Sequence, residues 1–563
     1  MKKSLGSHTG VVLVLLTCSV MSSRAADGIP LAPTTGADGA FETLRDQGAA
    51  AWHSLKDDRG AYWPFLYFRV PDAATRSRGP VYVEIRYKDT GPGRLALQYN
   101  GQHAGDNYRQ AERGFGRLMA GTGAVRTVVF ELAEPGFRHA QNLGADLRLA
   151  GPGGDTPLHV FSAALHEQPP AFFREHAAQP WLQAYKGPSR GDVDASALRG
   201  KVICGYQGWF RCPGDDTEQG WVHWSRDSSR ITPKTLTVEM WPDMTEYTQG
   251  EKFPAAEFRS ADGRPAYLFS SAHPRTVERH FEWMRDYGID GVLVQRFTNG
   301  LRDPAEASRV LGYARDAANR TGRIFAVEYD LSGMRAEGMP ERVAADWKWL
   351  VDEMKITADP RYLRQDGKPV LAIFGFYSDR FAAGVAHRMI DFFKDDPKYR
   401  VFLIGGVPWA WRTEKDVEWA RAYRRLDAIK PWNVGNTAKQ GGVVRAATRT
   451  WADDQAEARR AGMLWMPVLY PGFSWDNLQR RPPGTTIIPR RRGAFFREQF
   501  EAAARLGAET AFVAMFDEVD EGTAVFKVTS TPPQPGHIVT LEGLPSDTYL
   551  KLTGEGTKLI RGR

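Results

Sequence analysis

The sequence predicts an α/β protein: a (β/α)8 or TIM barrel that follows an N-terminal antiparallel β-sandwich. From residue 200 onward, continuous apolar runs alternate with amphipathic stretches, which is typical of a parallel sheet covered by helices. Before residue 170, short alternating runs recur about every ten residues between Gly, Pro and Asp, which is typical of a sandwich. The 563 residues are also too many for one ordinary domain.

Residues 1–25 predict a cleaved signal peptide. Lys2 and Lys3 precede the apolar run VVLVLLTCSVM, and small residues near Ala25 and Ala26 suit cleavage. The run is too short to span a bilayer, and no other stretch is apolar enough to do so. We therefore expect a secreted or periplasmic protein without a membrane span. Lipid attachment at Cys18 is the alternative.

Residues 38–170 predict the sandwich, which we interpret as a possible carbohydrate-binding accessory domain. Its clearest strands are YWPFLYFRVP, GPVYVEIRYKDTG and VRTVVFELAEP. Trp63, Tyr99 and Tyr108 could stack on sugars, or they could fill the interior of the sandwich. Residues 171–199 carry Pro and Gly without a clear period and predict a linker packed on its neighbours.

Residues 200–563 predict the barrel, because eight apolar runs there alternate with helical patterns. An open, doubly wound sheet is the structural alternative. No Gly-rich phosphate loop follows the first run, which disfavours nucleotide binding. The runs are KVICGY, DGVLVQRF, RIFAVEYD, PVLAIFG, VFLIGGVP, AIKPWNVG, MLWMPVLYP and AFVAMFDE.

Composition disfavours several other classes of protein. The formal charge of +7 is mild for this length and the basic residues are scattered, so we expect no nucleic-acid partner. His223 and His273 stand alone in sequence, and no Cys/His spacing resembles a zinc site, so we expect neither metal nor cofactor. Cys204 and Cys212 remain after signal removal; they could form a disulfide, or Cys204 could be a small apolar strand residue. Nothing indicates an oligomeric state.

Polar and aromatic residues gather where the predicted strands end, and the active site of such a barrel lies at the carboxyl ends of its strands. Aromatic faces, carboxylates and few cations suit a carbohydrate, whereas a phosphate site would need helix N-termini, Lys and Arg. The aromatic rim suits a cleft with several subsites. The predicted substrate-binding residues are Tyr206, Gln207, Trp209, Trp241, Gln295, Glu328, Tyr329, Asp330, Trp409, Trp432, Tyr470 and Trp475.

The last apolar run ends in a cluster of acids, in the sequence MFDEVDEGT. Cleavage of a glycosidic bond usually needs two carboxyl groups, and crowding pushes their pKa values apart. Glu518 and Glu521 are therefore the predicted catalytic pair, with Gly522 allowing the backbone to aim Glu521 over the barrel. A solvated acidic loop or a calcium-binding turn are the alternatives.

Residues from about 200 to 528 resemble glycoside hydrolase family 99, the endo-α-mannosidase family that is grouped with family 71. The similar segments are ICGYQGWF, GWVHWSR, YGIDGVLVQRF, RIFAVEYD, PVLYPGFSWDN and the final helix-strand segment. The family reads Asn-Glu-Trp-x-Glu-Gly-Thr where this chain reads DEVDEGT. The resemblance implies that Glu518 is a base acting on the substrate's 2-hydroxyl, whose oxygen attacks C1. It implies that Glu521 is the acid/base at the leaving oxygen, with net retention.

The chain departs from the family pattern at three positions. The Asn and Trp of the family motif are Asp517 and Val519 here, and the His of a Phe-His-x-Glu strand is Ala326, although Glu328 falls on the Glu. These departures bear on substrate identity more than on the class of reaction.

The expected function is therefore that of a secreted retaining glycoside hydrolase acting on a polysaccharide or glycan, possibly α-mannan-like. A non-catalytic carbohydrate-binding protein on the same scaffold is the first alternative. A glycan lyase or transglycosylase is the second.

Overall fold

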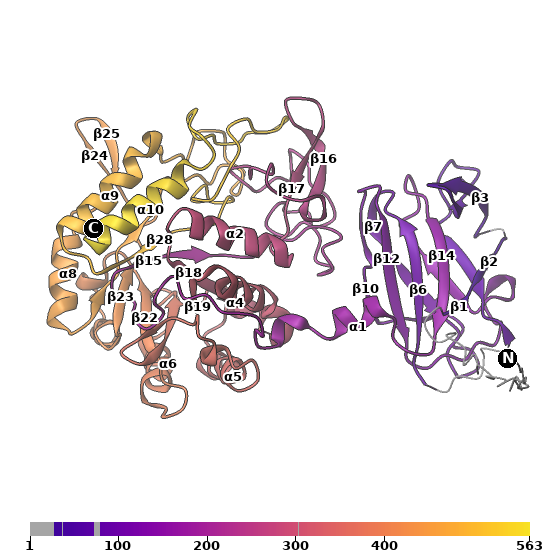
Figure 1. Ribbon diagram of the computed structural model, residues 1–563, viewed down its shortest axis with the longest axis horizontal. Helices are drawn as coiled ribbons and strands as arrows, with labels where there is room; N and C mark the ends of the chain where they lie inside the picture. Colours follow the sequence, from indigo (N-terminus) through magenta and orange to yellow (C-terminus); the bar gives the residue numbers. More distant parts are fainter. Residues whose placement is uncertain (1–27, 37, 73–78, 302, 563) are drawn as a thin grey trace, which may run out of the picture.

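The computed structural model describes residues 28–36, 38–72, 79–301 and 303–562. The predicted signal peptide lies outside these residues. Figure 1 shows two bodies side by side, an all-β part and a larger α/β part. The segment that joins them carries helix α1 (Ala171–Ala177), which lies within the predicted linker.

The N-terminal part contains two larger antiparallel sheets and one strand pair. The first sheet is formed by β1 (Ile29–Pro30), β3 (Phe41–Asp46), β4 (Ala49–Ser54), β6 (Val81–Lys88), β10 (Arg113–Phe115), β12 (Val125–Leu132) and β14 (His159–His166). The second is formed by β2 (Ala32–Thr34), β5 (Phe65–Arg69), β8 (Ala96–Tyr99), β9 (Arg109–Gln110) and β13 (Leu147–Ala150). The separate pair is β7 (Pro92–Arg94) and β11 (Leu118–Ala120).

Both N-terminal sheets bury apolar side chains in one common core. Val83 and Ile85 of β6 lie in the same cluster as Leu66 and Phe68 of β5. The alternation of buried and partly exposed residues along β6 follows from the two-residue period of a strand. Tyr99 is also buried in this cluster, so it fills the interior instead of facing a ligand.

The α/β part is built on one parallel sheet, in the order β26-β23-β22-β21-β19-β18-β15-β28-β27. Only Met466 and Pro467 separate its two end strands, β26 and β27, in the chain. All eight predicted runs contain strands, and the seventh is divided at Pro467. The strands are β15 (Lys201–Tyr206), β18 (Gly291–Phe297), β19 (Ile324–Asp330), β21 (Lys368–Phe374), β22 (Phe402–Val407), β23 (Ala428–Pro431), β26 (Leu464–Trp465), β27 (Val468–Leu469) and β28 (Thr510–Val513).

Helices lie between successive strands and after the last strand, and they pack on the sheet and on one another (Figure 1). They are α2 (Pro274–Asp286), α3 (Pro304–Ala307), α4 (Arg309–Thr321), α5 (Met339–Asp352), α6 (Ala383–Asp395), α7 (Val417–Tyr423), α8 (Trp451–Arg460), α9 (Ala494–Arg505) and α10 (Thr548–Arg561). Short antiparallel segments are β16 (Phe253–Arg259) with β17 (Pro265–Leu268), β24 (Thr437–Gln440) with β25 (Val443–Ala446), and β20 (Arg364–Gln365) beside β21. Isolated 3₁₀ turns occur at Asn142–Gly144, Pro180–Leu182, Gln249–Glu251, Thr298–Gly300, Ile356–Ala358, Trp411–Thr413 and Arg491–Gly493.

The loop that follows β15 joins the two parts of the molecule. Glu218 in this loop accepts hydrogen bonds from Arg117, at 2.5 and 2.6 Å, and from Arg94 at 2.8 Å. Arg126 of β12 donates to the backbone carbonyl of Gly214 at 2.6 Å. The N-terminal part therefore holds a loop that emerges from the first strand of the parallel sheet.

Two further sequence expectations concern cysteines and membranes. Cys204 and Cys212 are buried free thiols, and the Cys212 thiol lies 3.2 Å from the Phe269 carbonyl oxygen. Within the described part of the chain, no helix is both long and apolar enough to cross a bilayer.

Candidate active site

A cavity of about 930 Å³ lies at the carboxyl ends of the parallel strands. Its wall contains strand-end residues from β15, β18, β19, β21, β23 and β28. The wall also includes three arginines, Arg211, Arg296 and Arg380. The cavity therefore contains more cationic side chains than we expected. Nine of the predicted site residues line it: Gln207, Trp209, Gln295, Glu328, Asp330, Trp432, Trp475, Glu518 and Glu521.

Glu518 follows β28 and is 4% exposed. One carboxyl oxygen accepts a hydrogen bond from the Gln207 amide at 2.5 Å, and the other accepts one from the Thr523 hydroxyl at 2.8 Å. Burial raises the pKa of Glu518 well above its usual value, and the nearby charges of Glu521 and Asp520 add to the rise. The two hydrogen-bond donors act in the opposite direction, because they favour the ionised form.

Glu521 lies on the cavity side of the same turn and is only partly exposed. Burial raises its pKa to about 8, and Asp520 and Asp330 add to the rise by repulsion. The indole N–H of Trp475 offsets part of the rise. Glu521 therefore tends to keep its proton at neutral pH, as a general acid must.

Gly522 fixes the turn that carries the pair. Its φ of +64° lies in the left-handed region, and a Cβ there would approach the Ser474 backbone nitrogen to 2.9 Å. The Ser474 N–H donates to the Glu521 carbonyl at 3.0 Å, so the turn packs directly on the loop that carries Trp475. Only glycine adopts this positive φ without strain and also leaves room for the Ser474 backbone.

Asp517 belongs to the same turn but does not line the cavity. Its carboxyl accepts the backbone N–H groups of Gln207 and Gly208, at 2.8 and 2.9 Å. Complete burial outweighs these bonds and raises its pKa to about 7. Asp517 thus holds the turn after β15 against the turn after β28, which places Gln207 beside Glu518.

His223 is connected to the site by a contact with the Asp520 carboxylate and by a stack of aromatic rings. Its Nδ1 lies 2.9 Å from Asp520, and its ring stacks on Trp209 at 3.8 Å and 6°. Trp209 in turn stacks on Phe297 at 5.1 Å. No sequence spacing signals this pairing, because His223 and Asp520 are 297 positions apart.

A buried ion pair includes Glu328 of the cavity lining. Lys430 of β23 donates to Glu328 of β19, and both side chains are fully buried. The Gln295 amide donates to the other oxygen of Glu328 at 2.8 Å. The Lys430 ammonium lies 3.8 Å from the centre of the Phe512 ring, and burial lowers its pKa. Sequence analysis identified Glu328 and Gln295 but missed Lys430, which reads as part of an apolar run.

Two predicted substrate-binding tyrosines do not line the cavity. Tyr206 is buried against α2, with its hydroxyl 2.8 Å from Nδ1 of His280. The Tyr329 hydroxyl donates to Asp346 of α5 at 2.6 Å. Successive side chains of a strand face opposite sides of the sheet, so a residue beside a cavity-lining neighbour points into the helical layer.

Three other predicted residues also lie outside the cavity lining. Tyr470 is buried, with its hydroxyl donating to the Asn436 carbonyl at 2.8 Å. Trp241 packs under the β16–β17 hairpin and donates to the Tyr267 carbonyl at 3.0 Å. Trp409 follows β22 and is not among the lining residues.

Several polar atoms of the cavity lining are buried and have no hydrogen-bond partner among the described residues. They are Oε1 of Gln207, Oε1 of Gln295, Nε1 of Trp209 and Nε of Arg211. Such atoms are costly unless a ligand or water satisfies them. Two acceptors and two donors around one cavity match the hydroxyl groups of a sugar. Within the described residues, no group of three or more His, Cys, Asp or Glu side chains is placed to hold a metal ion.

Solved structures with a similar fold include glycoside hydrolases. The family 99 endo-α-mannosidase of Bacteroides thetaiotaomicron superposes with a TM-score of 0.50 at 18% identity, covering 65% of this chain and 99% of that chain. A second structure of that enzyme gives a TM-score of 0.49 with the same identity and coverage. An endo-β-1,4-mannanase of Thermotoga petrophila gives 0.32 at 12% identity, covering 51% of this chain and 74% of that chain. At these identities the likeness concerns the fold.

No family model matches the chain. No curated protein matches it either.

Proposed function

We propose that the protein is an exported, retaining glycoside hydrolase that acts on a polysaccharide or glycan, with Glu518 and Glu521 as its catalytic pair. One observation carries the proposal: both carboxyl groups line one cavity and have raised pKa values, among indole rings and unpaired polar atoms. The N-terminal part is, in this proposal, a β-sandwich that assists glycan binding. We take the boundaries at 38–170, 171–199 and 200–563 as the division into domains.

The proposal includes a closed eight-stranded barrel. The Met466 N–H donates to the Ile429 carbonyl of β23, and the Phe512 N–H of β28 donates to the Pro467 carbonyl, both at 2.9 Å. The seventh strand segment thus bonds to both edges of the sheet. A closed sheet collects all strand ends around one cavity, as the proposed chemistry needs.

The roles of the two glutamates are those that the family 99 resemblance implies. Burial and Asp520 raise both pKa values, and the Gln207 and Thr523 donors oppose the rise at Glu518. A pair that shares one proton at neutral pH supplies one base and one acid.

The reaction would follow the route that the family 99 resemblance implies. Glu518 removes the proton of the sugar 2-hydroxyl while that oxygen attacks C1, and Glu521 gives its proton to the departing glycosidic oxygen. Water then opens the 1,2-epoxide-like intermediate at C1; Glu521 takes a proton from the water and Glu518 returns its own to the sugar oxygen. The anomeric configuration is retained.

The test is a hydrolysis screen of the purified protein against α- and β-linked polysaccharides, including α-mannan. We expect new reducing ends from at least one substrate. Glu521→Gln should lower turnover about 10²–10⁴-fold, the usual contribution of general acid–base catalysis. Glu501→Gln, a change at an exposed site on α9, is the matched control and should leave the rate unchanged.

A carbohydrate-binding protein without catalysis is the second candidate, favoured by Asp517 and Val519 in the motif. It predicts saturable binding with no new reducing ends after long incubation. Sugar release that disappears in Glu518→Gln excludes it. A lyase product would be lighter by one water than the hydrolysis product, and a transglycosylase would yield longer chains, so mass analysis separates both from hydrolysis.

A further inference from the structure

A second cavity, of about 540 Å³, lies beside the candidate active site. The two cavities are lined by adjacent residues of the same loops: Phe297 lines the first and Thr298 the second, and Ser332 lines the first and Gly333 the second. The loops after β18 and β19 therefore form a wall that the two cavities share. A chain-like ligand in the active site would reach the second cavity by crossing this wall.

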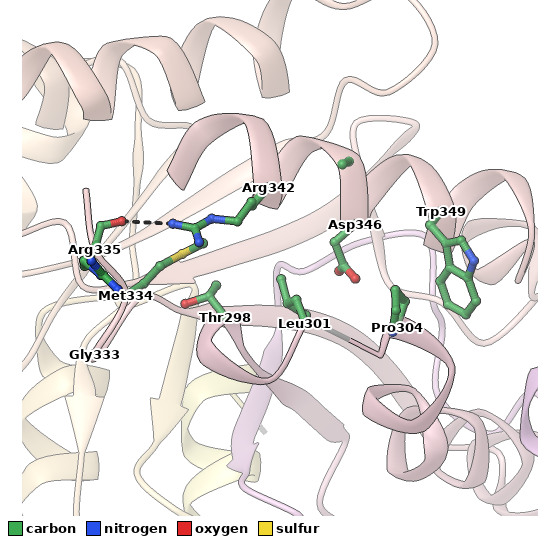
Figure 2. Close-up of a pocket in the computed structure, with 10 residues that line it drawn as sticks. Thr298, Leu301, Pro304, Gly333, Met334, Arg335, Arg342, Asp346 and Trp349 are labelled. Atoms are coloured by element: carbon green, nitrogen blue, oxygen red, sulfur yellow. Dashed lines mark hydrogen bonds between the residues drawn. The ribbon is translucent and has the colours of Figure 1, made fainter. Parts of the chain in front are cut away.

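One end of the second cavity is cationic. Figure 2 shows Arg335 and Arg342 together with Met334 at this end. Arg342 donates to the backbone carbonyls of Glu337 and Arg335, at 2.8 and 3.3 Å, which holds its guanidinium in place. Both arginines are exposed, and the Arg335 guanidinium has no partner among the described residues.

The carboxylate that lines this cavity does not neutralise the two arginines. Asp346 is 5% exposed and accepts two hydrogen bonds from Arg296, at 2.5 and 2.6 Å. The Tyr329 hydroxyl donates to the same carboxylate at 2.6 Å. Because Asp346 is already paired, the charges of Arg335 and Arg342 remain available to a ligand.

The other end of the cavity is apolar. Figure 2 shows Pro304 and the Trp349 indole at this end, with Leu301 between them and the arginines. Trp349 is partly exposed. An aromatic ring at one end of the cavity can contact the C–H face of a sugar ring while the arginines at the other end bind an anionic substituent of the same glycan.

We propose that this second cavity is a subsite for an acidic sugar residue, one that carries a carboxylate or a sulfate ester. Arg335 and Arg342 bind the anion at one end of the cavity, and Trp349 contacts a sugar ring of the same glycan at the other end. Guanidinium groups suit both anions, because their parallel N–H groups match two oxygens at once. The inference rests on the proposed function, since it names the class of glycan that the active site would receive: an anionic one.

The test is affinity electrophoresis in gels that contain dextran, carboxymethyl dextran or dextran sulfate, which share one backbone. We expect at least one charged polymer, and not dextran, to retard the native protein. In Arg335→Gln/Arg342→Gln the affinity for that polymer should fall at least fivefold. The single variant Arg335→Gln should show part of this loss without disturbing the loop, because Arg335 makes no side-chain bond within the described residues. The two charged polymers reveal whether carboxylate or sulfate is preferred.

The control is Arg421→Gln/Arg460→Gln, which removes the same charge from two exposed side chains of α7 and α8. It should be retarded like the native protein. Equal loss of affinity in the two double variants would overturn the proposal, as would equal retardation by dextran, or no retardation by either charged polymer.

Binding and turnover separate the two proposals. Suppose that a charged polymer binds and the binding depends on the two arginines, but no glycan is hydrolysed. This result would support the proposed subsite and contradict the proposed enzymatic function. Suppose instead that the protein does not bind charged polymers and that Arg335→Gln/Arg342→Gln hydrolyses glycan at the native rate. This result would support the proposed enzymatic function and contradict the proposed subsite.

Discussion

At the scale of single residues, the candidate site is explained by the cost of burying charge. Glu518 and Glu521 lie in one short turn, shielded from water and facing Asp520 and Asp330. Each proton that the pair loses adds charge to a poorly solvated place, so the pKa values rise. Hydrogen-bond donors oppose this rise, and Glu518 has two of them, Gln207 and Thr523.

The first prediction concerns the pH dependence of activity. Glycan cleavage should decline above about pH 8, where Glu521 loses its proton. Asp520→Asn should move this decline to lower pH, because the charge of Asp520 helps to raise the pKa of Glu521. The measurement is kcat/KM from pH 5 to pH 10. An alkaline limb that stays in place in Asp520→Asn would contradict the assignment.

The second prediction concerns stability. The folded protein keeps the Glu521 proton up to about pH 8, whereas the unfolded chain loses it near 4.5. Folding stability therefore falls as the pH rises through this interval. Glu521→Gln removes this penalty, so its melting temperature should exceed that of the native protein at pH 8 and differ less at pH 5. Thermal unfolding at both pH values tests this; a lower melting temperature at pH 8 would contradict it.

From the sequence, Glu518 and Glu521 were placed in the cavity lining, where the structure has them, but several aromatic residues were misplaced; the roles of these residues stay predictions. Glu518 and Glu521 could be placed because a strand end and a glycine define their position. Tyr206 and Tyr329 were predicted to face the cavity, but each stands next to a residue that does. Neighbouring residues of a strand face opposite sides of the sheet, so both tyrosines face the helices. Nothing in the local sequence distinguishes the two sides, because a parallel sheet buries both.

At the scale of elements, the eight apolar runs located the strands well, whereas four helices, α1, α6, α8 and α10, were not predicted. Helix α6 buries Ala386, Met389, Ile390 and Phe393 at helical spacing, a signal that was available. Helix α8 is too polar to show a face. Helix α10 contains Gly554, where a Cβ would meet the Tyr287 carbonyl oxygen at 1.9 Å, so tertiary packing overrides its low helix propensity.

The third prediction tests the turn after β28. Gly522→Ala should destabilise the protein by about 1–3 kcal/mol and reduce turnover, because the new Cβ is strained at positive φ and collides with the Ser474 backbone. Gly462→Ala is the matched control, since Gly462 has a φ of +70° but open space around it. Gly462→Ala should lower the stability of the protein only by the backbone strain and should leave activity unchanged. Equal effects of the two variants on turnover would contradict the account of the turn.

At the scale of the whole molecule, the N-terminal part is bound to the loop that forms one wall of the cavity. Glu218 accepts bonds from Arg94 and Arg117, and the next residue, Gln219, lines the cavity. The sequence predicted two parts but not this contact, because its partners lie more than 100 positions apart and have no shared pattern.

The fourth prediction follows from this contact. Arg94→Ala/Arg117→Ala should raise KM for the glycan several-fold by loosening the loop, with a smaller effect on kcat. Arg113→Ala is the control, because Arg113 pairs with Glu131 inside the N-terminal sheet. Steady-state kinetics distinguish them. An unchanged KM in the double variant would show that the N-terminal part does not support the site.

The measurement that tests the catalytic pair most directly is the first-turnover rate on two substrates. One is the glycan found in the screen, and the other is the 2,4-dinitrophenyl glycoside of the same sugar, whose leaving group needs no proton. Glu521→Gln should release dinitrophenolate at nearly the native rate but cleave the glycan about 10²–10⁴-fold more slowly, while Glu518→Gln loses both reactions. A Glu521→Gln variant that cleaves the glycan at the native rate, or loses both reactions equally, would contradict the account.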